Sequence, residues 1–99
     1  MAIDDWFSAS YGEARAKFQA AAQAAGAVQH SYAHPLKGPD GGDLAMDLAF
    51  LGPADAARVL VTSSATHGVE GFCCSGCQVG FLQSGLHSEL PDDMALLHV

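Results

Sequence analysis

The chain has 99 residues, of which 49% are hydrophobic, and four Lys and Arg stand against eleven Asp and Glu, for a formal net charge of −7. This length fits one small domain with a modest core, and the composition is globular rather than disordered. The acidic balance argues against nucleic-acid and anionic-membrane partners because no basic patch can neutralise phosphates, and no apolar run approaches the roughly 20 residues that span a bilayer.

The first predicted element is a helix over about residues 8–25. Ser10 and Glu13 have the spacing of a capping box, and Gly26 stands where a glycine commonly ends a helix. Apolar residues recur at helical spacing and form one stripe: Phe7, Tyr11, Ala14, Phe18, Ala21 and Ala25. Trp6, beside Phe7, is expected to attach this helix to the core.

Three strands are predicted next. Residues 28–34 and 44–50 each show the two-residue alternation of side chains that is typical of a strand with two different faces. The turn-rich segment 35–43 joins them, which predicts a β-hairpin. A third strand is predicted over 58–63. Because its apolar centre, 59–61, does not alternate, we expect that strand to be covered on both faces.

A second helix is predicted over about 70–84 and a last strand over 94–99. The order α-β-β-β-α-β predicts an α/β fold, the N-terminal part of an α/β/α sandwich with a mixed sheet and one strand–helix–strand crossover. Residues 1–99 are interpreted as a single partial domain. Since the sequence stops inside an apolar run, we expect the first portion of a larger domain; the alternative is a terminal strand that closes the sheet.

The stretch SSATHGVEG, residues 63–71, follows the third strand and leads into the second helix. Ligand sites in open α/β sheets form at such strand-to-helix turns. His67 and Glu70 can converge on one metal ion there, because zinc accepts imidazole nitrogen and carboxylate oxygen. Gly68 and Gly71 let the backbone turn sharply. In the alternative interpretation, Glu70 only favours the helix N-terminus through the dipole, and His67 is a loop residue.

The longer stretch SSATHGVEGFCCSGCQ resembles the zinc carboxypeptidase family, and more closely an uncharacterised carboxypeptidase-like subgroup with the motif T-H-G-V-E-G-F. The segments YGEARAKF and HPLKGPDGGDLAMDLAFLGP also match that subgroup, so the resemblance extends from about Phe7 onward. It implies a zinc cofactor bound by His67 and Glu70, and a peptide or an amide-linked small molecule as substrate. It further implies a second histidine on the zinc, a general-base glutamate and a substrate-binding arginine, all downstream of the motif.

Those downstream elements have no clear counterpart in this chain. Glu89 lies in a loop without matching context, and no arginine follows Arg58. His98 is interpreted as a strand residue and His87 as a surface loop residue. We therefore expect a truncated metallocarboxypeptidase-like hydrolase that binds zinc weakly and is inactive as this chain. The alternative is a non-catalytic remnant or interaction module.

The three cysteines, Cys73, Cys74 and Cys77, lie within five positions, which excludes a framework of long-range disulfides. Reduced thiols and an acidic start without the pattern of a secretory signal lead us to expect a cytoplasmic protein. Cys74 and Cys77 form a C-x-x-C, which leaves a small thiol-redox protein as a further alternative. The favoured interpretation makes all three thiols small hydrophobes on a helix packed against the sheet.

Overall fold

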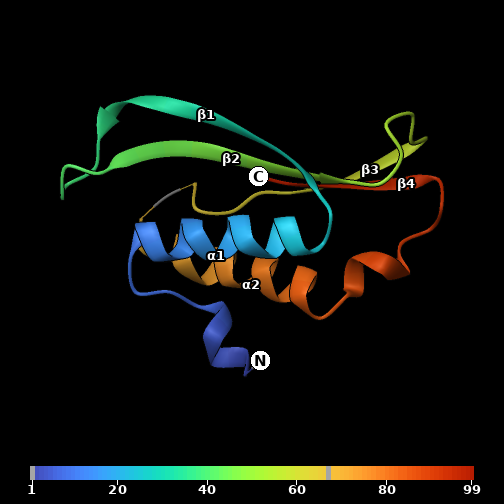
Figure 1. The fold of residues 1–99 in the computed structure, drawn as a ribbon, viewed down its shortest axis with the longest axis horizontal. Coiled ribbons are helices and arrows are strands. Elements are labelled where there is room, and N and C mark those ends of the chain that lie inside the picture. The colour runs from blue at the N-terminus through green and yellow to red at the C-terminus, as the bar shows by residue number, and fades with distance from the viewer. Residues whose placement is uncertain (1, 67) are drawn as a thin grey trace.

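The structure is a computed structural model that describes residues 2–66 and 68–99. It contains a four-stranded sheet with two α-helices on one of its faces (Figure 1). The elements in chain order are η1 (Ile3–Trp6), α1 (Tyr11–Ala24), β1 (Val28–Lys37), β2 (Asp43–Leu51), β3 (Arg58–Thr62), α2 (Gly71–Gln83), η2 (Leu86–Glu89) and β4 (Met94–His98). The predicted α/β class and element order are confirmed, and the two short 3₁₀ helices are additional. Within the described ranges no helix has the length and apolarity to cross a membrane.

The sheet is mixed, with the strand order β1-β2-β4-β3. The antiparallel hairpin of β1 and β2 is followed by an antiparallel pairing of β2 with β4. β3 and β4 are parallel, and α2 connects them, as the strand–helix–strand pattern predicts. The carboxyl ends of β3 and β4 therefore meet at the same edge of the sheet, next to the loop that leads into α2.

The prediction that the third strand is covered on both faces is wrong. Val59, Leu60 and Val61 are 47%, 40% and 58% exposed. β3 lies at the end of the strand order, and both helices lie on the same face of the sheet (Figure 1). An apolar run without alternation indicates that both faces of a strand are apolar. It does not indicate whether another helix or sheet covers those faces.

The core lies between the sheet and the two helices. The cap of α1 forms as predicted: the Glu13 backbone N–H donates to Ser10 Oγ at 3.2 Å, and Gly26 follows the helix with φ +80°. The buried cluster draws on both helices, β2 and β4: Phe18, Ala21, Ala22, Ala49, Val79, Leu82 and Leu96. The predicted stripe of the first helix thus faces the sheet.

Aromatic side chains at the start of the chain pack on α2. A Cβ at Gly76 would lie 2.3 Å from the Phe7 ring, and a Cβ at Gly80 would lie 2.3 Å from the Trp6 ring. Both rings therefore occupy space that a larger residue on α2 would fill. This contact ties η1 to the helix that begins at the motif.

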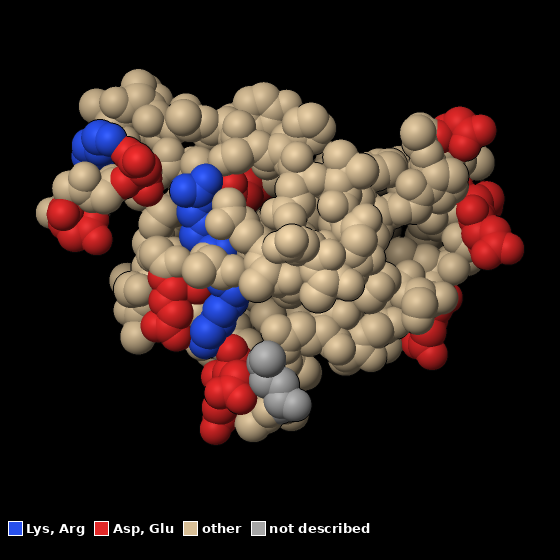
Figure 2. Space-filling model, viewed as in Figure 1, with Lys and Arg blue, Asp and Glu red and all other residues tan. Residues whose placement is uncertain are grey.

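Every Lys and Arg pairs with a carboxylate, so the part of the chain that the structure describes contains no cluster of unpaired Lys or Arg side chains. The pairs are Arg15–Asp47, Lys17–Glu13, Lys37–Asp43 and Arg58–Asp93. On the face shown in Figure 2, charged side chains lie in the left part and at the right edge, and the broad area between them carries none.

Candidate functional site

The motif forms the loop between β3 and α2. β3 ends at Thr62, and α2 begins at Gly71 with Glu70 as its N-cap residue. His67, the first predicted zinc ligand, lies outside the described residues. The geometry of the site is therefore defined by Glu70 and by the backbone on either side of position 67.

The described backbone of this loop is tightly folded. Ala65 has a φ of +56° and Gly68 has a φ of +24°. A Cβ at Gly71 would lie 2.5 Å from the Cα of Ala65, much closer than real contacts allow. The loop therefore touches the first residue of the helix directly, and only glycine fits at position 71 without a shift of the backbone.

The N-terminus of α2 begins with a 3₁₀-type turn. The N–H groups of Gly71, Phe72 and Cys73 donate to carbonyls three residues earlier, at 3.2, 3.2 and 3.1 Å. Glu70 is exposed, and its side chain makes no capping hydrogen bond to the helix. Its carboxylate is turned back over the loop, because a Cβ at Gly68 would lie 2.6 Å from Glu70 Oε2. This carboxylate is accessible to a ligand from solvent.

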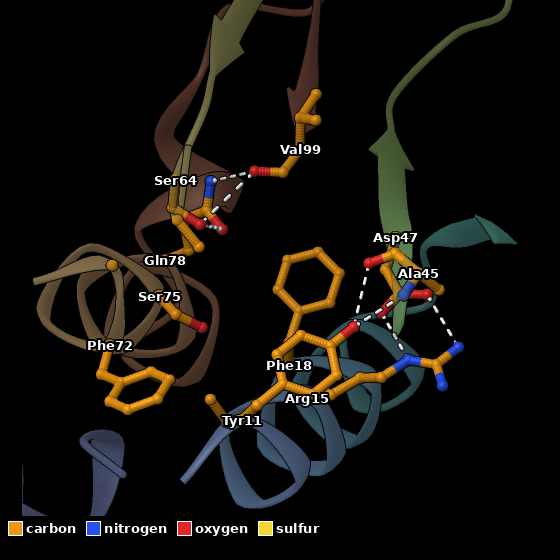
Figure 3. A pocket seen from close by; sticks show the side chains of 13 residues that line it. Tyr11, Arg15, Phe18, Ala45, Asp47, Ser64, Phe72, Ser75, Gln78 and Val99 are labelled. Carbon is orange, nitrogen blue, oxygen red and sulfur yellow. Dashed lines mark hydrogen bonds and ion pairs between the residues drawn. The ribbon is translucent and has the colours of Figure 1, made fainter. Parts of the chain in front are cut away.

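A cavity of about 140 Å³ adjoins the loop (Figure 3). Its lining joins residues of the motif to residues of α1, α2 and β2: Tyr11, Ala14, Arg15, Phe18, Ala45, Asp47, Ser64, Ala65, Gly71, Phe72, Ser75, Gln78 and Val99. The cavity therefore opens beside the motif, on the face of the sheet that carries the helices.

Polar contacts between α1 and β2 build one wall of this cavity. The Tyr11 hydroxyl donates to the Ala45 carbonyl at 3.0 Å and accepts from the Ala45 N–H at 2.8 Å. Arg15 donates to both carboxylate oxygens of Asp47, from Nε at 2.7 Å and from Nη2 at 3.2 Å. The hydrogen bonding of Arg15 to the Asp47 carboxylate raises the pKa of Arg15. Because Asp47 already holds this guanidinium in a bidentate pair, Arg15 is not a free cation for a substrate carboxylate.

Gln78 builds the opposite wall. Its Oε1 accepts from the Ser64 hydroxyl at 3.0 Å, and its Nε2 donates to Thr62 Oγ1 at 3.0 Å and to the Val99 carbonyl at 3.1 Å. Gln78 is 5% exposed, and both ends of its amide are satisfied. It therefore fixes α2 to the carboxyl ends of β3 and β4, where the motif loop starts.

Neither wall of the cavity was predicted, although the sequence contains an indication of each. Tyr11 and Arg15 are one turn apart on the first helix, so they lie on the same side of it. Asp47 is a charged residue at an alternate position of an apolar strand, which indicates a partner on the packed side. Gln78 is a polar residue next to the apolar Val79 in a mostly apolar helix, and the same reasoning applies to it.

The remaining histidines do not complete a metal site in the part of the chain that the structure describes. His98 is a strand residue, as predicted, and it is 1% exposed. Burial lowers its pKa to about 4, its Nδ1 hydrogen-bonds the Thr62 hydroxyl, and its ring packs edge-on against Phe81 with centroids 5.5 Å apart. His87 lies in η2. Over residues 2–66 and 68–99, no group of three His, Cys, Asp or Glu side chains could hold a metal ion.

The second helix packs against the sheet as expected, but its three cysteines do not take part as small hydrophobes, because Cys73, Cys74 and Cys77 are all exposed. Val79 and Leu82 pack in the core instead. The helix is apolar around most of its circumference, so its sequence does not indicate which side faces the sheet.

The family described as "Protein of unknown function (DUF2817)" matches residues 7–99. No curated protein and no solved structure is significantly similar to the chain. The match includes α1, the hairpin, the motif loop and α2, and therefore every element that surrounds the cavity.

Proposed function

Since the chain belongs to the DUF2817 family, whose description names no function, we propose from its site that it supplies part of a zinc-dependent hydrolase centre of the carboxypeptidase type, with His67 and Glu70 as metal ligands. The observation that carries the proposal is the Glu70 carboxylate, which is exposed at the start of α2, uses no capping hydrogen bond and turns back over Gly68. In the family that the motif resembles, H-x-x-E provides two zinc ligands.

Zinc at this place would polarise a water molecule and the carbonyl of a peptide or amide substrate. Catalytic zinc sites commonly use three protein ligands and leave one position for water. The described residues contain no such set of three, and Arg15 is already paired with Asp47. We therefore propose that the 99-residue chain binds zinc weakly and does not hydrolyse amides by itself. A third ligand, a general base and a substrate cation would have to be added to it.

The ion pairs of the chain also support the proposed choice of partner. Because every Lys and Arg is paired with a carboxylate, we propose neither a nucleic acid nor an anionic membrane as the partner. A peptide or an amide-linked small molecule fits the zinc chemistry better. We propose a cytoplasmic location on the basis of the three free thiols, which a reducing compartment maintains.

Zinc titration by calorimetry tests the proposal with the wild-type chain, Glu70→Gln and Glu89→Gln. Glu70→Gln keeps the size of the side chain and removes the charged ligand, so we expect zinc affinity to fall at least about tenfold. Glu89→Gln, at an exposed carboxylate of η2, is the matched control and should bind as the wild type does.

Equal zinc affinity of Glu70→Gln and the wild type would contradict the assignment of Glu70. A tight one-to-one site together with amide hydrolysis by the wild-type chain would contradict the proposal that the centre is incomplete. Circular dichroism of each variant establishes that the fold is retained before the affinities are compared.

A further inference from the structure

Three thiols gather on the exposed side of the first two turns of α2. Cys73, Cys74 and Cys77 are all exposed, and none is in a disulfide. Cys77 follows Cys73 by four positions and Cys74 by three, and residues at both spacings are neighbours on a helix surface. Cys77 therefore lies next to both other thiols.

Two further observations place Cys77 between its neighbours. Burial, with a smaller contribution from the neighbouring thiols of Cys73 and Cys74, raises the pKa of Cys77. On the other side, Cys77 and Cys74 line one cavity of about 300 Å³, which Phe81 and His98 also border. Both cysteines therefore border a space that is large enough for a small molecule.

The spacing of the residues is compatible with a disulfide within the helix. Cα atoms three and four residues apart on an α-helix are separated by about 5 and 6 Å, and disulfides span Cα separations of roughly 4.4–6.8 Å. The Cβ atoms must move closer than a regular helix places them. A disulfide at either spacing therefore requires a local adjustment of the helix between Cys73 and Cys77.

We infer that α2 carries a dithiol–disulfide site in which Cys77 is the common partner of Cys73 and Cys74, and in which a low-molecular-weight disulfide such as glutathione disulfide is the oxidant. The thiolate of Cys73 or Cys74 attacks one sulfur of the oxidant, forms a mixed disulfide and releases one thiol. The Cys77 thiolate then attacks the protein sulfur of that mixed disulfide and releases the second thiol. The two protein thiols are oxidised, and the oxidant is reduced to two thiols that carry the two protons.

The inference is independent of the proposed zinc chemistry, and it is tested in the presence of a chelator. The wild-type chain and the single variants Cys73→Ser, Cys74→Ser and Cys77→Ser are equilibrated with glutathione disulfide, quenched with an alkylating agent and weighed by intact mass spectrometry. We expect Cys73→Ser and Cys74→Ser each to lose the mass of two hydrogen atoms, to take up no alkyl group and to retain no glutathione. The wild type should form the same internal disulfide, and its third cysteine should carry one alkyl group or one glutathione. Cys77→Ser should retain glutathione and form no internal disulfide.

An internal disulfide in Cys77→Ser at the wild-type level would overturn the inference, as would a wild type that accumulates only glutathione adducts or disulfide-linked dimers. Fragmentation of the oxidised wild type gives a second readout that needs no variant. The one cysteine outside the disulfide, carrying an alkyl group or glutathione, must be Cys73 or Cys74, and finding Cys77 outside the disulfide would contradict its assignment as the common partner.

Discussion

Lowering the pH from about 7 to about 4 is expected to destabilise the folded chain by about 3 kcal/mol through His98 alone. His98 is 1% exposed, and burial lowers its pKa from 6.5 to about 4, with a smaller contribution from His87. Between these two values the unfolded chain binds a proton that the folded chain excludes. Stability is therefore complete above the unfolded pKa and is lost as the pH falls from about 6.5 toward about 4.

Urea denaturation followed by circular dichroism over this pH range measures the effect. His98→Leu, which cannot titrate, should show a much flatter pH dependence even if its stability is lower throughout. His30→Asn, at an exposed position of β1, is the matched control and should keep the wild-type slope. Asp93 affects stability in a lower pH range than His98 does. Arg58 lowers the pKa of Asp93, so the stability that Asp93 contributes is lost only as the pH falls below about 3.8.

An unchanged slope in His98→Leu would contradict the role of His98. Direct titration of the His98 ring by NMR provides a measurement that does not depend on a variant. A ring that titrates near 6.5 in the folded wild type would mean that burial does not exclude the proton.

Gly71→Ala is expected to destabilise the chain by about 1–3 kcal/mol and to weaken zinc binding at the motif. The added Cβ would lie 2.5 Å from the Cα of Ala65, a backbone atom that cannot rotate away. The clash must therefore be relieved by moving the loop or the start of α2. Either movement displaces Glu70, which immediately precedes the substituted residue.

Gly12→Ala is the matched control for this substitution. Gly12 also lies in a helix, α1, but a Cβ there would meet nothing within 4 Å. We expect Gly12→Ala to be neutral or to stabilise the chain by up to about 1 kcal/mol. Urea denaturation compares the two variants, and a Gly71→Ala chain as stable as Gly12→Ala would show that the loop does not touch the helix as described.

Local signals in the sequence account for much of the fold. The spacing of Ser10 and Glu13 predicted the cap of α1, and Gly26 predicted its end. The strand–helix–strand pattern around the motif predicted the parallel pair of β3 and β4. These features depend on residues a few positions apart, so the sequence carries them directly.

The features that escaped prediction depend on which surfaces meet. Val61 and Cys77 are exposed because of the way the helices and strands are arranged. Their apolar sequence neighbours would be the same if these side chains were buried, so the sequence does not predict the exposure. The Arg15–Asp47 pair joins residues 32 positions apart. The sequence shows the two charged residues, but it does not show that they pair with each other. At the candidate site, the turn was predicted, whereas the contact of Gly71 with Ala65 required coordinates.

A zinc titration of the isotope-labelled chain by NMR, with the rings of all five histidines observed separately, tests the His67–Glu70 pair most directly. The proposed pair predicts that the His67 ring responds at the lowest zinc concentration and that Glu70→Gln removes this preference. A first response at His30 or His34, the exposed histidines of β1, with His67 unchanged would contradict it.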